Sequence, residues 1–181
     1  RPGGAGVNPY TRHLIDQADV QAVDAALQSG WLTTGPTVAR FEAAVAGSVD
    51  AAGGVAVSSG TAALHCAMHA LDIGPGDEVI VPALTFVATA NAVLYQGGTP
   101  VFADVELDTL LLDPEQAATL FTPRTKALVT VDYAGQPSPY AALTALWVGI
   151  DFVSQPPANG VYLQPLWSWM QIGDFNPVFR L

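Results

Sequence analysis

The chain has 181 residues, of which 50% are hydrophobic and 12% are charged, so it is long enough for one domain or part of a larger one and too apolar for an intrinsically disordered chain. Six Lys and Arg against sixteen Asp and Glu, a net charge of −10, exclude the basic surface that binds nucleic acid or anionic membranes. No apolar run reaches the roughly 18 residues of a membrane span, and the single Cys66 excludes an internal disulfide, so we expect a soluble, acidic, cytoplasmic protein.

The first part of the chain, residues 1–50, is predicted to form an extended arm followed by two helices. Residues 1–12 are rich in Gly and Pro, which favours an extended conformation. Apolar residues at helical spacing predict a helix over 18–27 that ends before Gly30, and after a loop a second helix over 38–49.

Residues 51–146 alternate between short strands and helices, which predicts the core of an α/β protein. The predicted strands cover residues 55–57, 78–82, 100–105 and 125–133. The predicted helices cover residues 61–71, 87–95, 114–121 and 139–146. Strands joined by helices of about ten residues imply right-handed crossovers and a mostly parallel sheet covered on both faces. The alternation stops over residues 147–181, which are interpreted as a terminal extension or as a junction where sequence is missing.

Two strand-to-helix turns carry residues suited to a ligand. At the first, Ser59, Gly60 and Thr61 begin a helix, where unpaired N–H groups and hydroxyls suit a phosphate, although Ser and Thr at this position also act as simple caps. At the second, Phe86 either lies against a planar ring or packs in the core. In an open α/β sheet ligands bind beyond the carboxyl ends of the strands, so the two turns indicate one site.

A series of motifs occurs in one order between about Asn8 and Leu146. They are residues 29–36 with 41–42, 57–64, 74–80, 85–91, 100–105 and 124–127. Together they resemble the sugar-nucleotide aminotransferases of the DegT/DnrJ/EryC1/StrS family, which are fold-type I enzymes dependent on pyridoxal phosphate. The resemblance implies the three-layer, mostly parallel sheet of that fold's large domain, here incomplete. Residues 131–137 are most similar to the branch that aminates a UDP-4-keto-6-deoxy-N-acetyl-hexosamine on the way to pseudaminic acid.

The resemblance implies cofactor-binding roles for residues at both turns and near the C-terminus. Ser59, Gly60 and Thr61 would hold the phosphate of pyridoxal phosphate, and Phe86 would stack on its pyridine ring. Asn176 lies in a stretch similar to a later segment of the family, where it would reach across a homodimer interface toward the neighbouring subunit's cofactor.

The resemblance also implies a substrate-binding region in the first part of the chain. Tyr10, Trp31, Leu32 and Thr33 would contact the sugar nucleotide. The implied reaction transfers an amino group from a donor, glutamate, to a 4-keto-6-deoxy nucleotide sugar.

Two catalytic residues of the family have no counterpart between Leu146 and Pro165, so we expect a middle section to be missing there. One is the lysine that bonds to the cofactor aldehyde, and the other is the Asp that pairs with the pyridine nitrogen. The chain's one lysine, Lys126, matches a structural position of the family, and Asp151 is a less favoured substitute for the Asp, after a stretch at 147–150 that would form a strand. Transamination needs the lysine to hold the aldehyde and to move protons, so the chain alone is expected to be inactive or nearly so.

Other residues that resemble functional groups are assigned structural roles. His65 and His69 have the i, i+4 spacing of metal ligands, but no further ligands are expected nearby. Cys66 is expected to be a small buried hydrophobe. Asp104 ends a predicted strand. It either corresponds to an acid that the family has at this position or caps a turn.

Three functions therefore stay open. The first is the aminotransferase, and the second is a non-catalytic relative that binds only cofactor or nucleotide sugar. The third, a dinucleotide-binding domain, is weak because no Gly-x-Gly-x-x-Gly motif follows a predicted strand.

Overall fold

The computed structural model describes residues 14–48 and 51–149. The chain divides after Phe41 into two units. The first contains α1 (Gln17–Gln28) and the beginning of α2 (Pro36–Ser48), which continues into the second. Asp16 caps α1 by accepting from the N–H groups of residues 18 and 19, and Gly30, with φ +76°, follows its last turn. The two helices predicted over 18–27 and 38–49 are thus both present.

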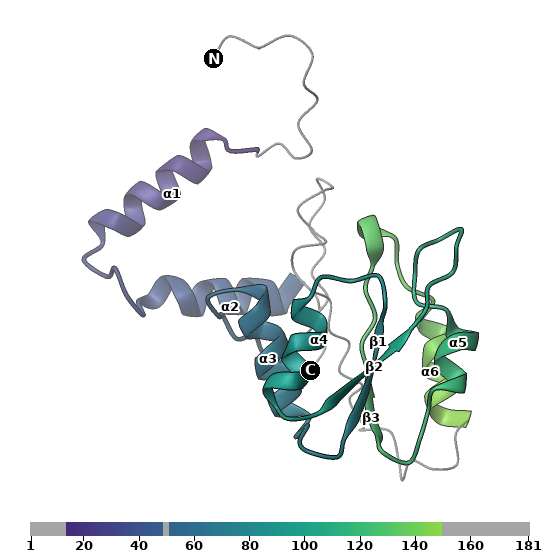
Figure 1. The fold of residues 1–181 in the computed structure, drawn as a ribbon. Coiled ribbons are helices and arrows are strands. Elements are labelled where there is room, and N and C mark those ends of the chain that lie inside the picture. The colour runs from purple at the N-terminus through teal and green to yellow at the C-terminus, as the bar shows by residue number, and fades with distance from the viewer. Residues whose placement is uncertain (1–13, 49–50, 150–181) are drawn as a thin grey trace. The chain divides into compact units, whose positions relative to one another are not determined.

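The second unit is built on a three-stranded parallel sheet in the order β2-β1-β3 (Figure 1). Its elements in chain order are α3 (Gly60–Ala70), β1 (Glu78–Pro82), α4 (Ala88–Tyr95), β2 (Thr99–Ala103), α5 (Pro114–Thr119), β3 (Thr125–Leu128), a 3-10 turn (Tyr133–Gly135) and α6 (Tyr140–Gly149). Every residue of β1 is buried, as expected of the central strand of a parallel sheet.

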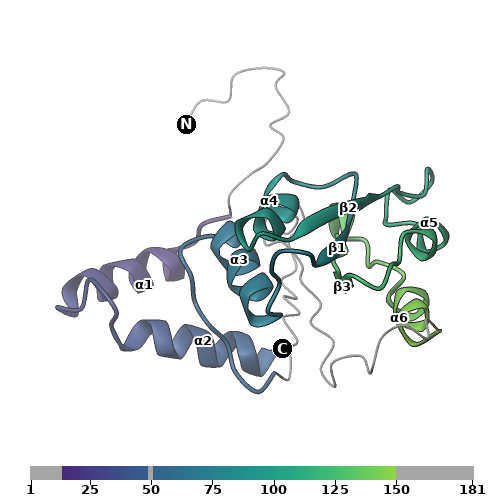
Figure 2. The same ribbon diagram turned by 60° about the horizontal axis from the view of Figure 1, so that its bottom comes forward.

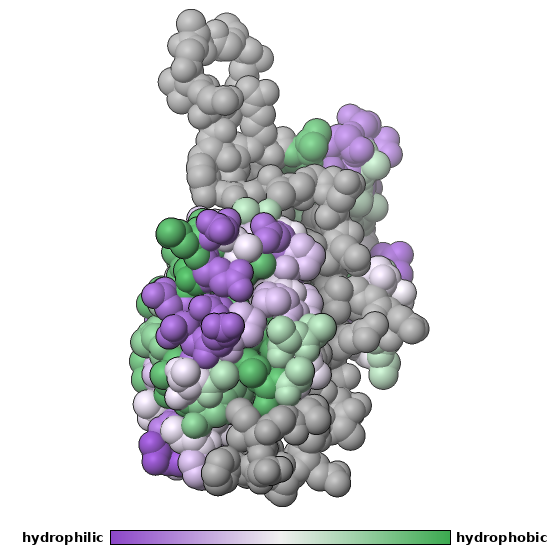
Figure 3. Space-filling view, turned by 90° about the vertical axis from the view of Figure 1, so that its right-hand side faces the viewer, coloured by the Kyte–Doolittle hydropathy of each residue, from purple (hydrophilic) through white to green (hydrophobic). Residues whose placement is uncertain are grey.

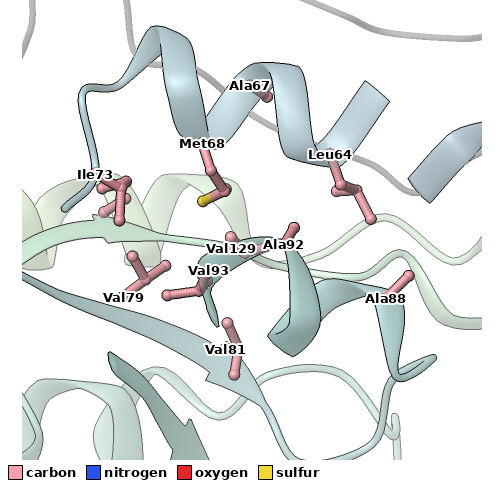
Figure 4. Packing of buried hydrophobic residues seen from close by; sticks show 11 residues of the cluster. Leu64, Ala67, Met68, Ile73, Val79, Val81, Ala88, Ala92, Val93 and Val129 are labelled. Carbon is pink, nitrogen blue, oxygen red and sulfur yellow. The ribbon is translucent and has the colours of Figure 1, made fainter. Parts of the chain in front are cut away.

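Helices cover both faces of this sheet (Figures 1 and 2). On one face α3 and α4 pack against Val79 and Val81 of β1, and Met68 is completely buried between them (Figure 4). On the other face α5 and α6 pack against Ile80, the residue between those two valines. Successive side chains of a strand point to opposite faces, so β1 supplies apolar residues to both cores. The predicted α/β fold with a mostly parallel sheet is confirmed.

The outer surface of the α5–α6 layer is mixed in polarity, with hydrophilic and hydrophobic side chains side by side (Figure 3). The exposed side of α5 carries Glu115 and Gln116, while Ala117 faces inward. Among the described residues, no helix is long and apolar enough to cross a membrane.

Three predicted elements differ from the structure. Residues 55–57 form no strand, because the described residues provide no neighbouring strand; the Ala56 N–H donates instead to the Glu42 side chain, at 2.8 Å. The strand predicted over 125–133 ends at Leu128. The stretch predicted as a strand at 147–150 is helical as far as Gly149, because α6 continues through it.

Candidate functional site

The two turns singled out from the sequence lie at the same end of the sheet. Residues 71–77 join the end of α3 to the start of β1, so α3 begins near the carboxyl ends of the strands; α4, which follows the carboxyl end of β1, begins there too. Figure 4 shows Leu64 of α3 and Ala88 of α4 at one end of their shared core, and Ile73 and Val79 at the other. The carboxyl edge of a parallel sheet is where α/β proteins bind ligands.

The N-terminus of α3 has the donors that an anion requires. Ser59 is the N-cap residue, and its Oγ accepts from the Ala62 N–H at 3.2 Å. The N–H groups of Gly60 and Thr61 donate to no other residue in the described part of the chain. The helix dipole adds partial positive charge at these unpaired N–H groups, so this donor set fits a phosphate group.

Phe86 lies in the turn between β1 and α4, and its side chain is 47% exposed. Phe86 was predicted either to lie against a planar ring or to pack in the core. The structure shows that it does not pack in the core. Leu84 and Val87, on either side of it in the turn, are also exposed apolar residues. A flat aromatic ring in an apolar turn, at the same edge of the sheet as the unpaired N–H groups of α3, fits a planar phosphorylated ligand.

A third segment at this edge is the loop that follows β3, and it is held by a buried carboxylate. Asp132 accepts from the Ser138 N–H at 2.9 Å and from the Tyr140 hydroxyl at 2.7 and 2.8 Å. The Thr130 hydroxyl donates to the Ser138 Oγ at 2.6 Å. Within this loop Ala134 adopts a left-handed conformation with φ 54°. The loop between Asp132 and Ser138 is thus fixed from both ends.

The opposite, amino end of the sheet holds the chain's one lysine. The Lys126 ammonium, on the second residue of β3, donates to the Asp72 backbone carbonyl and to Asp77 Oδ2, the latter at 3.3 Å. Asp77 Oδ2 also accepts from the Gly74 N–H at 2.9 Å. Lys126 therefore stabilises the loop between α3 and β1, and it lies across the sheet from the turns at Ser59 and Phe86.

An ionic cluster also lies at the amino end of the sheet. The buried Glu78 accepts from the Thr122 hydroxyl and from the Arg124 guanidinium, with the Arg124 Nε at 3.0 Å. The Thr122 hydrogen bond, followed by the hydrogen bond and charge of Arg124, holds the pKa of Glu78 below its ordinary value, against the effect of burial. This cluster joins the start of β1 to the segment before β3.

The predicted substrate-binding residues Trp31, Leu32 and Thr33 belong to the first unit, in the loop after α1. All three are exposed. At Gly35 a Cβ atom would lie 2.7 Å from the Trp31 Cβ, so glycine allows the loop to turn back closely over the tryptophan. The remaining predicted residues, Tyr10, Asn176 and Asp151, lie outside the described residues.

The residues given structural roles are on the outside of the second unit. His65 contacts Tyr95 edge to face, with ring centroids 5.3 Å apart. The expectation that Cys66 is buried is wrong: the thiol is exposed, because α3 buries the face that carries Leu64, Ala67 and Met68.

Asp104 makes a local contact in the turn after β2, where its carboxylate accepts from the Val105 N–H at 2.8 Å. This contact is of the turn-capping kind. No group of three or more His, Cys, Asp or Glu side chains able to hold a metal occurs in residues 14–48 and 51–149.

Several residues that shape the site were not identified from the sequence. Glu42 anchors the segment before α3 through Ala56, and Asp132 anchors the loop after β3. Thr85 and Thr89, on either side of Phe86, have hydroxyl oxygens 2.7 Å apart. The i, i+4 spacing of the two threonines was a usable signal, since it brings side chains together across a helical turn.

A parallel α/β sheet with unpaired N–H groups at a helix N-terminus and an exposed aromatic ring at its carboxyl edge has the arrangement of the α/β proteins that bind phosphorylated ligands. The model of the DegT/DnrJ/EryC1/StrS aminotransferase family matches residues 13–150. The chain therefore belongs to this family, as the motifs indicated.

Individual relatives agree with this assignment. The chain is 46% identical over 155 residues to the spore coat polysaccharide biosynthesis protein SpsC of Bacillus subtilis, covering 85% of this chain and 40% of SpsC. Its structure is similar to that of the sugar aminotransferase Spr1654 of Streptococcus pneumoniae in its PLP form, at 33% identity and a TM-score of 0.77, covering 83% of this chain and 39% of that one. An aminotransferase of Psychrobacter cryohalolentis matches at 38% identity and a TM-score of 0.72, over 78% of this chain and 36% of its own.

The chain thus spans about 40% of the length of the curated relative SpsC. Spr1654 has been determined in apo, PMP and PLP forms, with the same TM-score of 0.77 to this chain for each. Structures of the family thus include pyridoxal phosphate and its amino form, which are planar phosphorylated rings of the kind that the site geometry fits.

Proposed function

We propose that this chain contributes the pyridoxal-phosphate-binding core of a sugar aminotransferase. The observation that carries the proposal is the pair of turns at one edge of the sheet, in a chain that belongs to an aminotransferase family. Unpaired N–H groups of Gly60 and Thr61 and an exposed ring at Phe86 match the two ends of this cofactor. When bound, pyridoxal phosphate supplies the electron sink for transfer of an amino group.

Each predicted cofactor-binding residue has a proposed role. Ser59, Gly60 and Thr61 bind the phosphate through main-chain N–H groups and hydroxyls, and Phe86 stacks on the pyridine ring. Asn176 acts at the cofactor of the neighbouring subunit in a homodimer. The motifs around these positions in the sequence support these roles.

The proposed substrates are a 4-keto-6-deoxy nucleotide sugar and an amino donor, glutamate. Tyr10, Trp31, Leu32 and Thr33 contact the nucleotide sugar in this proposal. The sequence Val-Asp-Tyr-Ala-Gly-Gln-Pro at residues 131–137 supports the pseudaminic acid branch, while the similarity to SpsC supports a sugar for a surface polysaccharide. We place the reaction in the cytoplasm, a compartment in keeping with a free thiol at Cys66.

A second proposal concerns activity: the chain binds the cofactor but does not turn over by itself. Its one lysine, Lys126, lies at the amino end of the sheet and donates to the Asp72 carbonyl and to Asp77. An amine held there does not reach a cofactor bound at the carboxyl edge. The chain is then a binding module that needs a lysine from elsewhere to complete the transferase.

Absorbance spectroscopy with pyridoxal phosphate tests both proposals on the full chain. We expect saturable binding, seen as a change in the pyridoxal spectrum. We do not expect the band at about 410–430 nm that marks a covalent bond between the aldehyde and a lysine. After borohydride reduction, peptide mapping should find no pyridoxyl group on Lys126. If pyridoxal phosphate shows no saturable binding, the first proposal is contradicted. A reduced adduct on Lys126 contradicts the second.

Two variants serve as controls for this measurement. Replacing Gly60 by proline removes one unpaired N–H group at the first position of α3, where proline is tolerated by a helix, and should weaken binding. Lys126→Met should leave the affinity for pyridoxal phosphate unchanged, since Lys126 lies at the other end of the sheet.

A further inference from the structure

We propose that Thr89 is a positioning residue for the Phe86 ring: it fixes the turn that carries the ring and thereby strengthens binding of a planar phosphorylated ligand. This inference rests on the proposed function, because the partner of the ring is the pyridine of pyridoxal phosphate. Thr89 itself is 1% exposed, so it acts through the turn rather than on the ligand.

Two hydrogen bonds join Thr89 to the turn that carries Phe86, one to the Phe86 backbone and one to the Thr85 side chain. The Thr89 N–H donates to the Phe86 carbonyl at 3.0 Å. The Thr89 hydroxyl and the Thr85 hydroxyl are 2.7 Å apart, the distance of a well-formed O–H···O bond. The Phe86 carbonyl and the side chain of the residue before it are therefore both bonded to one buried residue.

The other end of the turn is tied as well. The Ala83 N–H donates to the Ala103 carbonyl at 2.8 Å, which attaches the first residue after β1 to the end of β2. Between Ala83 and Thr89, the turn therefore has a fixed beginning and a fixed end. The direction of the Phe86 Cα–Cβ bond follows from the backbone between them.

The N-cap position of α4 has no side-chain cap. The N-cap position is Val87, which has no oxygen to accept from the first N–H groups and makes no side-chain capping bond. Helices in general favour Ser, Thr, Asp or Asn at that position. The hydroxyl pair of Thr85 and Thr89 caps none of these N–H groups, but it supplies a side-chain hydrogen bond across the turn that carries Phe86.

Burial decides how much this bond matters. The Thr89 hydroxyl is shielded from water, so solvent does not replace its partner when the bond is lost. Thr85 is half-buried. Without the bond the segment from Thr85 to Val87 gains freedom, and a ligand must order the ring when it binds.

The test measures the dissociation constants of pyridoxal phosphate and of inorganic phosphate for the full chain and its variants. Thr89→Val removes the hydroxyl and keeps the branched shape, while Thr89→Ser keeps the hydroxyl. We expect Thr89→Val to weaken pyridoxal phosphate binding about fivefold, the effect of one buried hydrogen bond, and to reduce the induced circular dichroism of the bound ring. Thr89→Ser should restore the affinity to within about twofold of the unchanged chain.

Binding of inorganic phosphate separates positioning from general damage. It uses the N-terminus of α3 and not the ring, so Thr89→Val should leave it unchanged. A matched control is Thr119→Val, which removes a threonine hydroxyl that donates to the Gln116 carbonyl at 2.8 Å in α5. This control should change neither dissociation constant.

A double-mutant cycle with Phe86→Leu tests whether Thr89 acts through the ring. If it does, Thr89→Val changes pyridoxal phosphate affinity by less than about twofold once Phe86 is already replaced. Equal effects of Thr89→Val with and without the ring would overturn the proposal. So would a parallel loss of phosphate and pyridoxal phosphate binding, or unchanged pyridoxal phosphate binding in Thr89→Val.

Failure of this proposal differs from failure of the proposed function. If the unchanged chain does not bind pyridoxal phosphate, both are refuted. If it binds and Thr89→Val binds equally well, only the role of Thr89 is refuted. Should Thr89→Val not fold, Thr85→Val removes the same bond from the less buried side, and the same outcomes decide.

Discussion

Replacing Glu78 with glutamine tests the ionic cluster at the amino end of the sheet. Glu78 accepts from Thr122 and Arg124, and its side chain is 10% exposed, whereas that of Arg124 is 63% exposed. Glutamine keeps the size and one acceptor oxygen but removes the charge. Hydrogen bonds to a charged group contribute about 1.5–3 kcal/mol and neutral ones about half as much. Because Arg124 is largely solvated, we expect a loss of about 1–2 kcal/mol in the free energy of unfolding at pH 7.

The pH dependence of this loss has a definite sign. The pKa of Glu78 is lowered in the folded chain, so its carboxylate binds protons less readily there than in the unfolded chain. The stabilisation is fully present above the ordinary pKa of glutamate, about 4.3, and is lost as the pH falls through the lower folded value. The difference between the unchanged chain and Glu78→Gln should therefore shrink below about pH 4.

Urea denaturation followed by far-ultraviolet circular dichroism at several pH values measures this difference. Asp108→Asn, a similar change at an exposed acid, is the control and should alter stability little at any pH. A difference between Glu78→Gln and the unchanged chain that is constant from pH 7 to pH 3 would refute the assigned role of the charge. A difference near zero at pH 7 would refute the cluster as a source of stability.

Four further substitutions, at three positions, have expected effects on the same measurement. Met68→Ala should lower the free energy of unfolding by about 2–5 kcal/mol, since Met68 is completely buried between α3, α4 and β1 and its removal leaves a cavity; a loss below about 1 kcal/mol would contradict this packing. Ser59→Ala should lower the free energy of unfolding by about 1 kcal/mol because it removes the cap on the Ala62 N–H. Ser59→Gly should lower it by only a few tenths of that amount. Equal losses in the two variants would argue against capping. Ala134→Gly should raise stability by about 0.5–1 kcal/mol, because glycine adopts the left-handed conformation without strain; a decrease would mean that the methyl group makes a contact worth more than the strain.

The fold was predictable from the sequence where local signals act together. β1 was predicted at residues 78–82, where the structure has it, and Gly30 ends the first helix as expected. The helix start at Ser59 was also readable, since a cap depends only on its own first turn. These features need no knowledge of distant residues.

The errors arise where distant residues decide. Residues 55–57 have the composition of a strand, but a strand exists only beside a partner, and here Glu42 supplies the contact instead. Cys66 is of a residue type that is usually buried, yet the orientation of α3 places it outside. The side chains around Asp132 come together only through the path of the chain after β3.

The buried carboxylate of Asp132 has a consequence for molecular recognition at the carboxyl edge. Its bonds to Ser138 and Tyr140 give residues 133–137 one backbone path before any ligand arrives. A surface that is already arranged loses little conformational entropy on association, so more of its contact energy remains as affinity. Discrimination between similar ligands at residues 133–137 would then depend on which side chains the loop displays, while the backbone beneath them stays the same.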